Sequence, residues 1–231
     1  MRTSSLTITA SALVAALALG TAAHATPGDH LGAGTLAFAD PNPAAGISYE
    51  WTLSLKKKEK ASFVWYVGAK SWSEPSNPDG LKGWTHTANW VAIELAEPAV
   101  LAITVERQGG VVYSAAGVQV LARGALVPAL SLYSGWDDTT EFEEHNFDNA
   151  GNFWATLDYI GNQPNLPNRK GDTKTRVSYK TKKLPAGRYT LVIGGNPPVI
   201  ASYPDAGCDA NDATCHDYTG PHGYRATVEA R

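Results

Sequence analysis

Cysteine, methionine and charged residues are all scarce in this chain. Its 231 residues include two Cys and one Met, and only 18% are Asp, Glu, Lys or Arg. Hydrophobic residues make up 43%, which is enough apolar surface for a core and excludes a disordered chain. A basic excess is also missing, because the net charge is -3 and the pI is about 6.1. We therefore expect no nucleic-acid partner, and the pI gives no reason to expect attraction to anionic lipid.

Signatures of familiar enzyme sites are absent from the sequence. It contains no G-x-S-x-G, no H-E-x-x-H and no phosphate-binding Walker loop. Acidic side chains are present in plausible loops, but a sequence does not set the distance between two carboxylates, which acid–base catalysis requires. We therefore expect a binding protein and not an enzyme.

One long apolar run is present, and it lies at the N-terminus. Arg2 precedes an apolar stretch over 6–19 that is too short to span a bilayer comfortably. Ala23-His24-Ala25 then forms an A-x-A cleavage site, with a competing site ending at Ala23. Residues 1–25 are predicted to be a signal peptide, and 26–231 a single domain with no transmembrane segment. The predicted location is secreted, periplasmic or on the outer cell surface.

Export decides how the two cysteines are interpreted. Cys208 and Cys215 lie in one short segment, and an oxidising compartment favours a disulfide between them. Such a bond closes a small loop, so it would restrain that loop more than the whole domain.

The periodicity of the remaining chain is that of β-strands. Ile47, Tyr49, Trp51, Leu53 and Leu55 alternate with polar residues, as in a strand with one buried face. Further strands are expected at 61–67, 90–95, 100–107, 127–133, 176–183, 188–194 and 224–228, and 114–123 is ambiguous. The pairs 47–55 with 61–67, 90–95 with 100–107, and 176–183 with 188–194 are expected to form hairpins. The predicted fold is an all-β, antiparallel β-sandwich with long functional loops and little helix.

The segment 134–172 is long for a loop in a compact domain, and such segments often carry function. A short helix around 153–160 is one expectation for it. Two oxygen-rich groups of side chains leave Ca²⁺ open as a second ion, although neither has EF-hand spacing. These groups are Asp137, Asp138, Glu141, Glu143 and Asp148, and Asp205, Asp209, Asn211 and Asp212.

Histidine is rare, and only five histidines follow the predicted signal peptide. In an extended segment Trp84 and His86 project from the same face, because side chains repeat every two positions. His145 could join them from the long segment. Two neutral imidazoles suit copper or zinc. The alternative is that each histidine is an ordinary surface or hydrogen-bonded residue.

Trp84-Thr85-His86, followed by His145 in the segment HNFDNAGNFW, resembles the copper-binding surface proteins of methane oxidisers, the MopE and CorA family. The resemblance implies that Trp84 is oxidised to kynurenine. It also implies that His86, His145 and the kynurenine amine hold Cu(I), for copper acquisition or storage. Cell-surface or outer-membrane proteins are the partners that this role suggests. An intact indole N–H is a donor only, so ring opening is what would create a ligand.

Two other functions remain open from the sequence. A calcium-shaped carbohydrate-binding or adhesion module would use Trp72, Trp84 and Trp90 as a stacking platform. A copper monooxygenase would need cleavage after Ala23, which leaves His24 as the N-terminal residue with a free amine.

Overall fold

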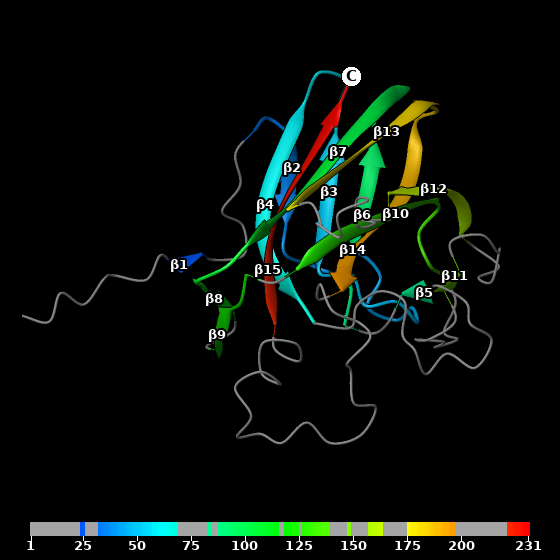
Figure 1. Cartoon of the computed structure of the whole chain (residues 1–231). Coiled ribbons are helices and arrows are strands. Elements are labelled where there is room, and N and C mark those ends of the chain that lie inside the picture. The colour runs from blue at the N-terminus through cyan, green and yellow to red at the C-terminus, as the bar shows by residue number, and fades with distance from the viewer. Residues whose placement is uncertain are drawn as a thin grey trace, which may run out of the picture.

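The fold is built from strands, as the computed structural model of the chain shows (Figure 1). The structure describes residues 24–25, 32–68, 83–84, 87–115, 118–124, 126–138, 147–148, 157–163, 175–196 and 221–231, and these contain no helix. The six-stranded sheet has the order β12 (Asp158–Gln163), β10 (Val127–Ser134), β14 (Gly187–Asn196), β6 (Asn89–Leu95), β3 (Trp51–Leu55), β2 (Thr35–Ala37). The four-stranded sheet has the order β13 (Arg176–Leu184), β7 (Ala99–Gln108), β15 (His222–Ala230), β4 (Lys60–Val67). Two smaller sheets contain β1 (His24–Ala25), β8 (Val111–Ala115) and β9 (Val118–Ala122), and β11 (Phe147–Asp148) with β5 (Gly83–Trp84).

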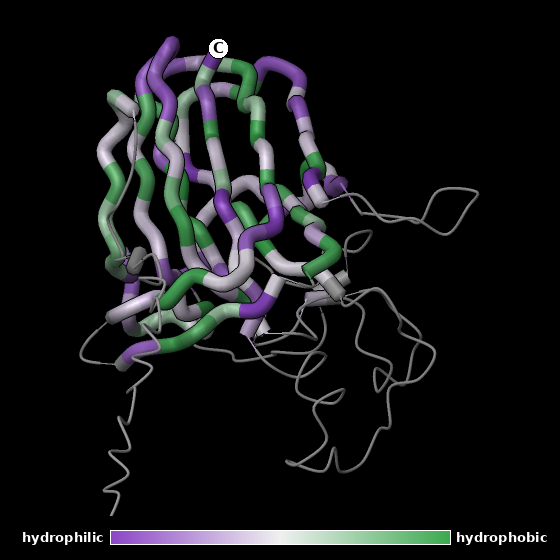
Figure 2. The backbone as a smooth tube through the Cα atoms, turned by 60° about the vertical axis from the view of Figure 1, so that its left-hand side comes forward, coloured by the Kyte–Doolittle hydropathy of each residue, from purple (hydrophilic) through white to green (hydrophobic). Residues whose placement is uncertain are grey.

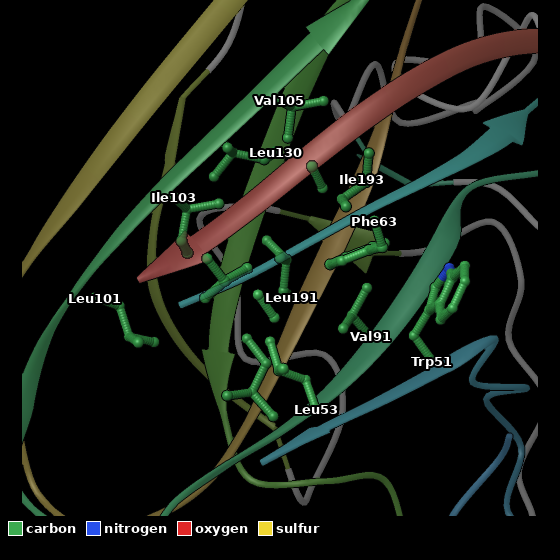
Figure 3. Packing of buried hydrophobic residues seen from close by; sticks show 14 of the residues in the cluster. Trp51, Leu53, Phe63, Val91, Leu101, Ile103, Val105, Leu130, Leu191 and Ile193 are labelled. Atoms are coloured by element: carbon green, nitrogen blue, oxygen red, sulfur yellow. The ribbon is translucent and has the colours of Figure 1, made fainter. Parts of the chain in front are cut away.

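The main core lies between the two large sheets, and the alternating residues of the strands fill it. Trp51, Leu53 and Leu55 of β3 are buried, while Thr52 and Ser54 between them are partly exposed. Figure 3 shows Leu53 and Leu191 of the six-stranded sheet among Phe63, Leu101 and Ile103 of the four-stranded sheet. The expected sandwich is therefore present.

Central strands of the six-stranded sheet are buried on both faces. In β6, Val91 and Ile93 belong to the main core, whereas Trp90 and Ala92 belong to a second cluster on the outer face of the sheet. We call this second group the outer cluster. Its buried members are Ile47, Tyr49, Trp84, Ala88, Trp90, Ala92, Ala129, Tyr133, Leu157 and Val192.

All three expected hairpins are wrong, although the strands themselves exist. The strands β3 and β4, β6 and β7, and β13 and β14 are consecutive in the chain, but each pair divides between the two sheets. The turns therefore cross the core and do not join hydrogen-bonded neighbours. A strand that buries one face shows the same alternation whether the next strand lies beside it or opposite it, so the pattern cannot separate these two cases.

The described sheets are antiparallel except for two pairs, β3 with β6 and β1 with β8. The ambiguous segment 114–123 contributes to the β8–β9 hairpin. The helix expected around 153–160 is wrong in its described part, because residues 158–163 form β12. Residues 1–23 of the predicted signal peptide and the cysteines Cys208 and Cys215, with their predicted disulfide, lie outside the described residues. No helix in the described part of the chain is long and apolar enough to cross a membrane.

Candidate metal centre

A short antiparallel ladder joins the two segments that contain the candidate ligands. β5 pairs with β11, with Trp84 opposite Phe147 and Gly83 opposite Asp148. These strands lie toward the end of the sandwich away from the C-terminus (Figure 1). The WTH segment and the HNF segment are about sixty residues apart in the sequence. The tertiary structure therefore brings their flanks into direct contact.

Trp84 is fully buried, with 0% of its side chain exposed. Its ring belongs to the outer cluster, so the outer face of the six-stranded sheet fixes its position. Two partly buried aromatics, Trp136 and Tyr159, also pack against this cluster. This packing fixes Trp84 in its place within the ladder.

A hydrogen-bond network anchors the beginning of the long segment to the sheet. The N–H of Asp137 donates to the Tyr49 hydroxyl at 2.9 Å, and that hydroxyl contacts Oγ1 of Thr190 at 2.8 Å. Thr190 Oγ1 in turn donates to the carbonyl of Gly135 at 2.8 Å. The Asp137 carboxylate accepts the N–H of Ile47 at 2.8 Å. Residues 135–138 are therefore fixed on the outer cluster just before the segment that contains His145.

Replacing Tyr49 with Phe is expected to lower the free energy of unfolding by about 1–3 kcal/mol, because the buried N–H of Asp137 loses its acceptor. Burial raises the pKa of Tyr49 to about 12, so its hydroxyl keeps its proton and can donate to Thr190 across the usable pH range. Urea unfolding measures the change. Tyr179→Phe is the matched control, since the structure shows no hydrogen bond for that hydroxyl within the described residues. An equal loss in the control would disprove the anchoring role.

The carboxyl group of Glu50, just before β3, lies beside the start of β6. Oε2 of Glu50 accepts the N–H of Trp90 at 2.6 Å, and the Asn89 side chain also bonds to the carboxylate. Desolvation is the dominant effect on this group and raises the pKa of Glu50 to about 8, although the hydrogen bonds oppose the rise. Burial raises the pKa of Tyr66 and of Tyr224, and the charge of Glu50 adds to both rises.

Of the predicted site residues, the structure describes Trp84 and no other. His86 and His145 lie outside the described residues, as does Trp72. Within the described residues no three His, Cys, Asp or Glu side chains gather closely enough to hold a metal. For calcium, Asp137 and Asp138 have described side chains, and the Asp137 carboxylate is engaged by a backbone N–H. The proposed stacking platform does not form, because Trp84 and Trp90 are both buried.

Two residues that matter near this centre were not expected from the sequence. Glu50 occupies a polar position of an alternating strand, where a solvent-facing carboxylate is the usual result. Asp137 was grouped with possible calcium ligands, yet its carboxylate caps a backbone N–H. No sequence signal distinguishes a carboxylate that faces solvent from one that bonds to a backbone N–H, because the outcome depends on which segment packs against the residue.

No family model and no curated protein matches the chain. Among solved structures, a similar chain is CorA, described as a surface-associated copper-binding protein important in copper acquisition by Methylomicrobium album BG8. The TM-score is 0.45 and the identity 16%, over 74% of this chain and 93% of that chain. Another is MopE, a secreted protein of Methylococcus capsulatus in a mercury-soaked structure, in which an oxidised tryptophan is said to facilitate copper binding. Its TM-score is 0.44 and the identity 13%, over 90% of this chain and 99% of that chain.

Proposed function

We propose that the protein is an exported copper-binding protein that holds Cu(I) through His86, His145 and an oxidised Trp84. The predicted signal peptide supports export to the cell surface or beyond. Binding without turnover suffices for acquisition or storage of copper, so no catalytic residue is assigned. The register of the β5–β11 ladder is the observation that carries this proposal.

In an antiparallel ladder, each step forward along one strand is a step back along the other. Trp84 lies opposite Phe147. Two further residues in the same register would set His86 directly opposite His145. Directly opposite residues project from the same face, with Cβ atoms about 4.5–5.5 Å apart. Alternation would then put Trp84, His86 and His145 on one face.

The chemistry of these donors suits Cu(I). Two neutral imidazole nitrogens are good copper ligands, and bonds of about 2 Å from each can meet at one ion between opposed side chains. A set of neutral donors also avoids placing an uncompensated anion next to the buried outer cluster. Copper, when bound, would be the cargo of the protein and also a centre that reacts with dioxygen.

The third donor requires a change in Trp84, because an intact indole N–H has no lone pair for a metal. Dioxygen is the oxidant: it opens the pyrrole ring and both oxygen atoms enter to give N-formylkynurenine. One water then releases the formyl group as formate and leaves an aryl amine. Burial in the outer cluster holds the ring in place, so the new amine would face the same ion as the two histidines.

The peptide that contains Trp84 is expected to be heavier by about 4 Da in protein isolated from copper-replete cells, since one carbon is lost and one oxygen gained. Mass spectrometry of the digested, secreted protein tests this, together with copper analysis of the intact protein. Replacing Trp84 with Phe should leave copper bound by two imidazoles with lower affinity.

Trp90→Phe is the matched control, because it removes similar volume from the same outer cluster without touching the proposed donors. Its copper affinity should equal that of the wild type. If Trp84→Phe also retained full affinity, the ring would have no role in binding. A wild-type protein without stoichiometric copper would remove the proposed function altogether.

A further inference from the structure

Six exposed lysines gather at one end of the sandwich. They are Lys56, Lys57, Lys58, Lys60, Lys182 and Lys183, which we call the basic end. The register sets Leu55 beside Leu95 and Leu95 beside Gly187, so the turns after β3, β6 and β13 lie together. Hydrophilic residues, purple in Figure 2, accordingly lie in the turns at the end of the molecule where the C-terminus lies.

A β-bulge in β13 turns two consecutive lysines toward solvent. Lys180 pairs with Ala102 and Lys183 with Val100, so three steps on β13 match two on β7. The extra residue leaves both Lys182 and Lys183 exposed, where a regular strand would bury one of them. Lysines on an edge strand also discourage edge-to-edge pairing. The three lysines of the β3–β4 turn are not in a strand, so protection of a sheet edge does not explain why they are there.

Carboxylates at the basic end are occupied by other partners. Glu59 accepts the backbone N–H of Lys56 at 2.8 Å, and Glu97 accepts that of Lys57 at 3.2 Å. Glu229 pairs with Arg231 at 2.7 Å. Within the described part of the chain, none of the six ammonium groups forms an ion pair. These carboxylates keep their negative charge, and Arg231 and then Lys60 help to lower the pKa of Glu229, but the six lysines outnumber them, so an excess of positive charge remains for an outside partner.

The opposite end of the sandwich is connected to acidic sequence. Segment 197–220 leaves the end of β14 and returns to the start of β15, both at the end away from the basic end. It contains four aspartates and no Lys or Arg. The net charge of -3 is a sum over the whole chain, so the pI gave no sign of the basic end. A charge that is concentrated at one end orients a protein in the field of a charged surface.

We propose that the basic end docks the protein on an anionic lipid surface. Lysine ammonium groups are compact, flexible and strongly hydrated, so they suit many phosphate headgroups better than a single bidentate site. The cluster extends over the four-stranded sheet from β13 to β4, about 14 Å at the usual strand spacing. Docking here would leave the β5–β11 ladder, near the other end, facing away from the membrane.

Sedimentation with lipid vesicles tests the proposal without copper, so its result is independent of the proposed copper site. The secreted protein should pellet with phosphatidylglycerol vesicles at low salt, remain soluble with phosphatidylcholine vesicles, and be released by high salt. Each lysine neutralised should lower the partition coefficient by about fivefold. The variants are Lys182→Gln with Lys183→Gln, and separately Lys56→Gln with Lys57→Gln.

Arg176→Gln with Arg225→Gln is the matched control, because it removes the same charge from exposed positions farther along β13 and β15. Its partition coefficient should stay at the wild-type value. An equal loss in this control would show a net-charge effect and overturn the assignment of the basic end. Absence of wild-type binding to the anionic vesicles, or binding to soluble heparin alone, would overturn the lipid surface as the partner.

Discussion

Replacing His86 with Ala is expected to lower the Cu(I) affinity of the secreted protein by at least about 100-fold, the upper range seen when a mere outer-shell partner of a metal site is lost. His145→Ala should have an effect of similar size. The double variant should lose little more than either single one, because a lone imidazole no longer chelates and the two losses are not additive. Competition with a chromophoric Cu(I) chelator measures all three affinities.

His30→Ala and His216→Ala are the controls, since neither residue belongs to the two ladder segments. Both should bind copper as the wild type does, and thermal unfolding should show the same stability for every variant. If His86→Ala lost copper while His145→Ala kept it, the register would not extend beyond Trp84 and Phe147 as proposed. Loss in His216→Ala would move the centre to the C-terminal segment.

The free energy of unfolding is expected to fall between about pH 5 and about pH 8, with a slope from Glu50 of up to about 1.4 kcal/mol per pH unit. The folded state raises the pKa of Glu50 from 4.5 to about 8. Below the unfolded value both states hold the proton, and the favourable contribution of the neutral side chain is fully present. As the pH rises toward the folded value, the unfolded state alone releases its proton, so stability is progressively lost.

Replacing Glu50 with Gln should remove this slope, because an amide keeps an oxygen for the Trp90 N–H and never ionises. Urea unfolding at several pH values gives the difference between variant and wild type, in which the other titrating groups cancel. Glu94→Gln is the control at an exposed position, and its pH dependence should match the wild type. A wild-type curve as flat as that of Glu50→Gln would mean that the carboxyl remains solvated.

Strand positions were predictable because they depend on local alternation. Residues 51–55 and 127–133 alternate or run apolar in the sequence, and both segments are strands in the structure. Strand pairing was not predictable in the same way. A turn such as 56–59 is polar and short whether it closes a hairpin or crosses between sheets, and here it crosses. The partial burial of Glu50 was missed for a related reason, since it depends on the start of β6 packing beside it.

By itself, the sequence determined the class of the fold, and it supplied the prediction of export and the residue types that could bind copper. Each of these follows from composition or from residues close together in the chain. Only the tertiary structure decided which sheet each strand enters, that residues 83–84 lie beside 147–148, and that the lysines share one end. Those relations join residues far apart in the chain, and the burial of the two hydrophobic clusters, not any local pattern, selects them.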